Sequence, residues 1–193
     1  MHLSAARVVK GFTLIELMVS IAIVAILLAL ATPSFVDYFE RYRLRSAVDD
    51  TLNLYAAARQ GAVEADRNVR VTFASSTSDW CVGGVQQTDP VAVGDPVPVS
   101  PAACDCGSTP AGCSVNGATL VASEAGRDVT IGSGGTDLTF DSKNGTLNPL
   151  GTAEIDFFSS TQRYGLRVQV SALGQARACV IPGKRAIPGY SPC

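Results

Sequence analysis

One carboxylate interrupts the long apolar stretch near the N-terminus of this 193-residue chain. Residues 12–34 are apolar or small almost throughout, and Glu16 is the only charged side chain among them. An ionisable group costs a few kcal/mol in a segment that enters a membrane, and it marks function by default. A carboxylate in apolar surroundings also requires a partner. Glu16 is therefore the first candidate functional residue.

The cysteines form a second group of reactive side chains: Cys81, Cys104, Cys106, Cys113, Cys179 and Cys193. An even number in an exported domain indicates disulfides, and six cysteines allow 15 connectivities. Chain distance favours Cys179 with Cys193, which closes the C-terminal tail into a loop. Cys104 and Cys106 are too close for an easy mutual bond, so each is expected to pair elsewhere, one of them with Cys113. A metal site is the weaker alternative, because the spacing is C-x-C and no histidine completes it.

This sequence offers few side chains that could perform enzymatic chemistry. The single histidine, His2, lies ahead of the apolar segment. Without an imidazole in the rest of the chain, Ser-His-Asp and Cys-His arrangements cannot form there. The glycine-rich run Gly132-Ser133-Gly134-Gly135 lacks the Lys-Ser/Thr of a phosphate-binding loop. The sequence predicts no enzyme, no catalytic residue, no metal and no cofactor.

The apolar segment predicts one helix that is long enough to span a bilayer, because a helix rises about 1.5 Å per residue. Arg7 and Lys10 precede this segment, and basic residues stay on the cytoplasmic side of a membrane. The C-terminal part is then expected outside, where disulfides form. About 155 residues remain for it, enough for one domain with its own core.

The junction Gly11-Phe12-Thr13-Leu14-Ile15-Glu16 resembles the cleavage signal of type IV prepilins. In that family a dedicated peptidase cuts between the glycine and the phenylalanine, and the new amine is methylated. The resemblance implies cleavage between Gly11 and Phe12, N-methylation of Phe12, and an assembly role for Glu16 as the fifth mature residue. The amine of Phe12 on a neighbouring subunit would then pair with Glu16 and bring an incoming subunit into register. An ordinary anchor whose glutamate reaches the membrane surface is the alternative.

Beyond the apolar segment, helical periodicity continues from Phe35 to about Arg67. Two apolar stripes follow this periodicity, and the first is expected to pack on a sheet. Its members are Leu44, Val48, Leu52, Tyr55, Ala58 and Ala62. The second stripe, which is expected to face other subunits, consists of Phe35, Phe39 and Tyr42.

Short apolar runs between Gly, Pro, Ser and Asp predict strands after Asn68. The expected strands are 69–73, 80–82, 118–122, 128–131, 138–140, 154–158 and 162–170. The last of them alternates apolar and polar residues from Arg163 to Val170, which indicates an antiparallel sheet with one face on the helix. The pair Asn144-Gly145 predicts a tight hairpin turn.

Residues 41–83 resemble the GspH/FimT branch of pilin-like proteins, which includes FimT- and FimU-like minor pilins. The similarity is carried by Arg43-Leu44-Arg45-Ser46-Ala47, by Ala58-Arg59 and by Arg67-Asn68. Trp80-Cys81-Val82-Gly83 and Cys104-Asp105-Cys106 are similar to FimU-like members. Gly61 departs from the family pattern and costs about 1 kcal/mol of helix stability.

Charge is distributed unevenly along the chain. Residues 71–156 hold ten acidic and two basic side chains, whereas residues 157–193 hold five basic and no acidic ones. The five are Arg163, Arg167, Arg177, Lys184 and Arg185. Clustered cations bind phosphates, so DNA binding is one hypothesis. FimT-like proteins carry Gly-Arg-x-Arg where this chain has Gly174-Gln175-Ala176-Arg177, with one arginine missing. The alternative is a solvated strand face, or a basic surface that meets an acidic region of a neighbour.

These features predict an α+β, pilin-like fold: a long N-terminal helix, membrane-spanning in its first half, packed on an antiparallel β-sheet. The expected organisation is a leader peptide at 1–11, a transmembrane and assembly helix at 12–34, and a periplasmic GspH/FimT-like domain at 35–193.

The resemblance implies a minor type IV pilin that helps to initiate pilus assembly and supports twitching motility or adhesion. A type II secretion pseudopilin and a DNA-binding pilus subunit for natural transformation are the alternatives. Expected partners are other pilins and minor pilins, the prepilin peptidase and the inner membrane, and DNA is a further partner under the last alternative. The protein is expected first in the inner membrane and then in a cell-surface pilus.

Overall fold

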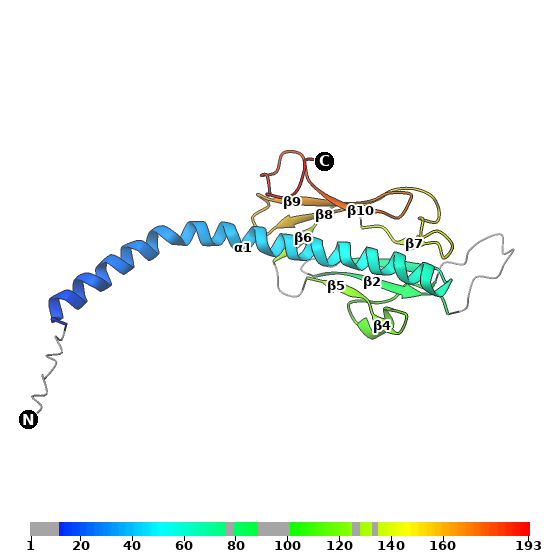
Figure 1. Ribbon diagram of the computed structural model, residues 1–193, viewed down its shortest axis with the longest axis horizontal. Helices are drawn as coiled ribbons and strands as arrows, with labels where there is room; N and C mark the ends of the chain where they lie inside the picture. Colours follow the sequence, from blue (N-terminus) through cyan, green and yellow to red (C-terminus); the bar gives the residue numbers. More distant parts are fainter. Residues whose placement is uncertain (1–11, 76–78, 89–100, 125–127, 133–134) are drawn as a thin grey trace, which may run out of the picture. The chain divides into compact units, whose positions relative to one another are not determined.

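One helix runs through both compact units into which the chain divides, Met1–Phe39 and Glu40–Cys193. This helix is α1 (Leu14–Ala65), drawn in Figure 1. The computed structural model describes residues 12–75, 79–88, 101–124, 128–132 and 135–193, without the side chains of residues 30–34.

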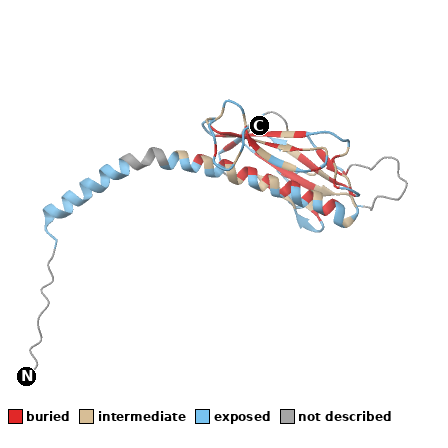
Figure 2. Cartoon of the chain, turned by 45° about the horizontal axis from the view of Figure 1, so that its top comes forward, coloured by how far each residue is buried: buried red, intermediate tan, exposed pale blue. Residues whose placement is uncertain are grey.

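In the first unit, α1 is exposed on every side. Each side chain from residue 12 to residue 29 is exposed to solvent (Figure 2), although nearly all of them are apolar. Nowhere in the described residues does a helix combine the length and the apolar character required to cross a membrane. The membrane segment predicted at 12–34 includes residues 30–34, whose side chains lie outside the described residues.

In the second unit, α1 buries the first predicted stripe. Leu44, Val48 and Ala58 have no exposed surface, and Tyr55 and Ala62 are also buried. Leu52, the remaining member, is partly buried. The second predicted stripe, Phe35, Phe39 and Tyr42, is more than half exposed at every position. The helical periodicity therefore identified the buried face of the helix correctly.

Two four-stranded antiparallel sheets pack with the helix, in the orders β5-β2-β1-β7 and β10-β9-β8-β6. The first sheet contains β1 (Val69–Ser75), β2 (Trp80–Gln86), β5 (Val121–Ser123) and β7 (Leu138–Phe140). The second contains β6 (Val129–Ile131), β8 (Ala153–Ser159), β9 (Gly165–Val170) and β10 (Ala176–Val180). A short 3-10 helix, η1 (Pro110–Gly112), precedes the small hairpin of β3 (Ser114–Val115) and β4 (Ala118–Thr119).

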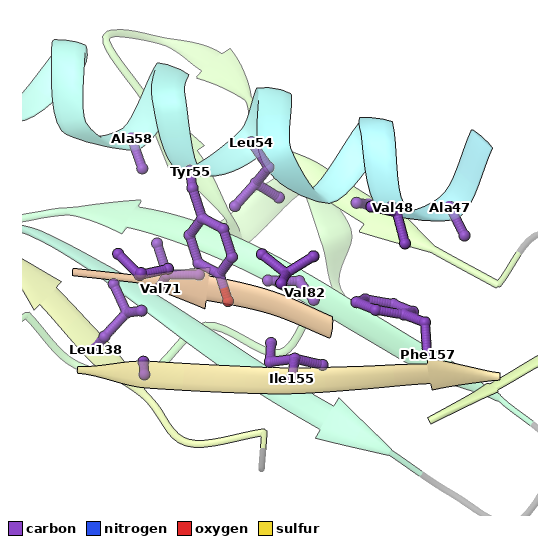
Figure 3. Close-up of a cluster of buried hydrophobic side chains, with 14 of the residues drawn as sticks. Ala47, Val48, Leu54, Tyr55, Ala58, Val71, Val82, Leu138, Ile155 and Phe157 are labelled. Carbon is purple, nitrogen blue, oxygen red and sulfur yellow. The ribbon is translucent and has the colours of Figure 1, made fainter. Parts of the chain in front are cut away.

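The helix and the two sheets share one core, part of which is drawn in Figure 3. Tyr55 points from α1 toward the strands, and its ring meets Phe140 edge-on with centroids 6.4 Å apart. Trp80 and Phe157 join the two sheets in the same geometry at 5.2 Å. Each such pair contributes about 1 kcal/mol beyond its burial. Burial also raises the pKa of the Tyr55 phenol well above its ordinary value.

The predicted α+β architecture, a long helix on antiparallel strands, is confirmed, and the strands divide between two sheets. The sequence analysis missed β10, because Ala176-Arg177-Ala178 offers small side chains rather than large apolar ones. The turn at Asn144-Gly145 is longer than the tight hairpin turn that was predicted. The chain leaves Phe140 and returns at Leu147, and the Asp141 carboxylate accepts the N–H groups of Lys143 and Asn144.

The two-residue turn lies instead at Asn116-Gly117, between β3 and β4, with φ of 51° and 78°. Asn-Gly favours such a turn because both positions require positive φ. This hairpin packs on α1 at Gly61, where a Cβ atom would collide with the side chain of Val115. Gln86 reinforces the contact by donating to the carbonyl of Gly61 at 3.3 Å. The glycine that weakens the helix is therefore needed for packing.

We expect Gly61→Ala to destabilise the protein by about 1–3 kcal/mol, because the added methyl group overpacks the contact between the helix and Val115. At an exposed helical position the same change would stabilise by about 1 kcal/mol. Urea unfolding of the full chain in detergent micelles measures the difference.

The matched control is Gly61→Ala combined with Val115→Ala, which removes the methyl groups that collide. In the Val115→Ala background the Gly61→Ala change should be neutral or stabilising. A destabilisation of equal size in both backgrounds would contradict the proposed contact.

Candidate assembly site

Phe12 and Glu16, two of the residues predicted to act in processing and assembly, lie at the start of α1. Gly11 lies outside the described residues, and Phe12 is 82% exposed ahead of the helix. Glu16 is exposed in the first helical turn, and its N–H donates to Thr13 Oγ1 at 3.3 Å. Thr13-Leu14-Ile15-Glu16 thus has the S/T-x-x-E pattern of a capping box. The sequence analysis missed this helix cap by Thr13, although the pattern is visible in the residues.

The helix surface that carries Glu16 is mostly apolar. The large apolar side chains between Leu14 and Leu28 are each more than half exposed. An exposed apolar surface of this extent indicates contact with other protein chains or with lipid. Glu16 is the only charged residue of this stretch. No side chain of residues 12–29 can therefore supply a cation that neutralises Glu16.

Matches to known protein families add to the evidence from the helix-and-sheet fold and from the apolar first part of α1. The prokaryotic N-terminal methylation motif matches residues 7–32, and these features define a pilin-like structural subunit rather than an enzyme. The chain belongs to the family described as type II transport protein GspH, whose model matches residues 47–174.

Curated relatives match the N-terminal part of the chain. A fimbrial protein of Pseudomonas aeruginosa is 46% identical over 55 residues, which cover 28% of this chain and 36% of that protein. The type IV major pilin PilE1 of Neisseria gonorrhoeae is 56% identical over 39 residues, or 20% of this chain and 24% of that protein. The chain therefore aligns with well under two thirds of the length of these relatives.

Among solved structures, the chain is similar to the type IV minor pilin FimU of Pseudomonas aeruginosa (strain PAO1). The two are 17% identical with a TM-score of 0.46, and the alignment covers 78% of this chain and 97% of that chain.

Two of the five cations proposed for DNA binding are engaged in ion pairs inside the second unit. Arg163 reaches the buried carboxylate of Glu40 at 3.1 Å. Arg167 forms two bonds to Asp156, at 2.6 and 2.8 Å, and a third to Glu154 at 3.1 Å. The hydrogen-bonded carboxylate of Asp156 raises the pKa of Arg167. These charges are compensated, which weakens their attraction for phosphate.

Of the other three cations, Arg177 and Arg185 are exposed and Lys184 is partly buried. Arg177 donates to the Gln169 side-chain oxygen at 3.1 Å. Lys184 donates to the carbonyl of Gln162 at 2.8 Å, and Arg185 is exposed. DNA binding by these residues stays a prediction.

Three disulfides use all six cysteines. Cys81 bonds Cys106, Cys104 bonds Cys113, and Cys179 bonds Cys193. These pairs agree with a closed tail and with separate partners for Cys104 and Cys106. Because every thiol is bonded, the alternative of a cysteine metal site is removed.

The first two disulfides pack against β2 at Gly83. A Cβ atom at this position would lie 2.6 Å from Cys113 Sγ in the second disulfide and 2.9 Å from Cys106 Cβ in the first. Glycine is therefore required where the strand meets the two bonds.

The C-terminal tail is also held by side chains. Ile187 inserts into the core with 1% of its surface exposed. Tyr190 donates its hydroxyl to Asp49 on α1 at 3.0 Å. Partial burial and this bond raise the pKa of Tyr190 to about 12. The tail is thus a fixed part of the second unit.

Replacing both Cys179 and Cys193 by Ser opens a loop with a sequence separation of 14. The chain-entropy model gives about 3 kcal/mol for a loop of this size. We expect the free energy of unfolding to fall by about this amount, measured by urea denaturation of the full chain in micelles without reductant.

Tyr190→Phe is the comparison variant, because it removes only the hydrogen bond from the tail to Asp49, which is worth about 1 kcal/mol. The serine variant should lose clearly more stability than Tyr190→Phe. An equal loss, or no loss in the serine variant, would contradict a stabilising role for the covalent link.

Proposed function

We propose that this chain is a minor type IV pilin, a subunit of low abundance that helps to start pilus assembly. The observation that carries the proposal is the first part of α1, where residues 14–29 expose large apolar side chains and Glu16 is the only charged residue. The methylation motif over residues 7–32 supports the same role.

In this proposal, processing creates the partner that Glu16 needs. Cleavage between Gly11 and Phe12 leaves a positively charged amine at the new N-terminus, and residues 12–34 hold the subunit in the inner membrane. When subunits pack side by side, the amine of one lies within reach of Glu16 of the next. In apolar surroundings an unpaired carboxylate is costly, so pairing selects the correct register.

The second unit is the part presented outside the membrane. Its three disulfides suit an oxidising compartment such as the periplasm. Phe39 and Tyr42 leave apolar surface exposed on α1 for contacts between neighbouring subunits. The unit thus supplies a rigid, folded outer surface to the filament, and adhesion and twitching motility are the expected outcomes.

A second candidate is a pseudopilin of the type II secretion machine. The family description, type II transport protein GspH, favours this candidate. Both candidates use the same processing and the same assembly chemistry, and they differ in the filament that the subunit enters.

We expect Glu16→Ala to leave cleavage intact and to lower the amount of the chain in sheared filaments about tenfold or more, because loss of one partner leaves the other charge buried and unpaired. Mass spectrometry of the N-terminus measures cleavage, and quantitative immunoblotting of sheared filaments measures incorporation.

Glu16→Gln separates charge pairing from helix capping, since glutamine keeps the capping-box pattern but carries no charge. The pairing proposal predicts that Gln fails as Ala does. Thr13→Ala, which removes the cap at a cost of about 1 kcal/mol, should be incorporated nearly normally. Normal incorporation of Glu16→Gln would mean that helix capping, and not charge pairing, is what assembly requires.

A further inference from the structure

A groove of about 1210 Å³ lies in the second unit, between α1 and the end of the second sheet. Leu52, Ala56 and Val63 line it from the helix, and Ala176 and Arg177 line it from β10. Ala56 is exposed, and 46% of the Val63 surface is exposed. The groove therefore joins an apolar helix stripe to an edge strand.

The backbone of β10 is open on the side away from β9. β10 is the terminal strand of its sheet, and the N–H of Ile181 donates to the carbonyl of Gly165 across to β9 at 3.1 Å. Peptide groups alternate in direction along an antiparallel strand. Ala176, Ala178 and Val180 therefore present their N–H and C=O groups on the free edge.

The chain's own tail already pairs with one end of this edge. The N–H of Val180 donates to Ser191 at 2.8 Å, and the carbonyl of Val180 accepts from Cys193 at 3.0 Å. Among the described residues, no backbone hydrogen bond reaches the outward groups of Ala176 or Ala178. The edge of β10 thus already pairs with the tail at Val180. Its free part, at Ala176 and Ala178, can pair with a second extended segment beside the groove.

The charges of the groove favour an acidic occupant. Arg59 and Arg177 donate to uncharged oxygens, and neither forms an ion pair with a described residue. The two lining carboxylates have partners: Glu154 pairs with Arg167 at 3.1 Å, and Glu64 accepts from a neighbouring side-chain amide. Arg59 and Arg177 can therefore each form a new ion pair with a carboxylate of an occupant, at positions set by the two side chains.

We propose that this groove binds an extended, carboxylate-bearing segment of a neighbouring pilin-type subunit, which adds to β10 as a strand beside the tail. Main-chain bonds to Ala176 and Ala178 supply binding, and Arg59 or Arg177 receives the carboxylate. Addition of a strand to an exposed sheet edge is a common mode of peptide recognition. This inference rests on the proposed function, because it requires a filament in which a neighbour can reach the groove.

The test places a photoreactive benzoylphenylalanine at Ala56 of the full chain in cells and analyses sheared filaments after irradiation. We expect an adduct with an Asp- or Glu-containing segment of another pilin-type subunit, identified by mass spectrometry. The same residue at Ala118, exposed on β4 away from the groove, is the position control and should not capture that segment.

Ala178→Pro tests the strand pairing itself, because proline removes an outward N–H and is tolerated on edge strands. The adduct yield should fall about tenfold in Ala178→Pro and remain unchanged in Ala178→Ser, which keeps the N–H. If Ala178→Pro lowers the urea midpoint of the chain, Arg177→Gln replaces it, with a loss of adduct again expected.

Three outcomes would overturn the groove proposal: no adduct at Ala56 although the chain is in the filaments, an adduct unaffected by these variants, or an adduct only with nucleic acid or with the chain's own tail. All three leave the proposed function standing. Absence of the unmodified chain from sheared filaments would instead contradict the proposed function, and the groove proposal with it.

Discussion

The close approach of α1 to the strands is the constraint on which the second unit depends. Ala47, Ala58 and Ala62 are fully buried on the helix, and their small side chains allow both sheets to reach it. Gly61 extends this close packing to the β3–β4 hairpin, at some cost to the helix itself. Larger residues at these positions would separate the layers that surround Tyr55.

In the first unit the same helix buries none of the apolar side chains at residues 12–29, and all of them are exposed. The buried core, the three disulfides and the anchored tail all lie in the second unit. Residues 12–29 carry an exposed apolar surface with Glu16 as their one charged residue. In the proposed function, this charge sets the register, and folding and assembly are separated along a single helix.

Periodicity made the helix and its buried face predictable, because burial on one side leaves apolar residues at helical spacing. The closed tail could be predicted because Cys179 and Cys193 are only 14 residues apart in the sequence. The partners of Arg163 and Arg167 could not be predicted, since Glu40 and Asp156 are brought to them only by the fold. β10 was hidden by its alanines, whereas the Asn116-Gly117 turn and the Thr13 cap were visible in the sequence and were overlooked.

Deletion of the gene, with quantification of sheared surface pili, tests the proposed role of the subunit as a whole. A minor pilin that helps to start assembly predicts that pili disappear or fall sharply and return on complementation. Unchanged pilus numbers would contradict that role, and a simultaneous loss of type II secretion would identify the chain as a pseudopilin.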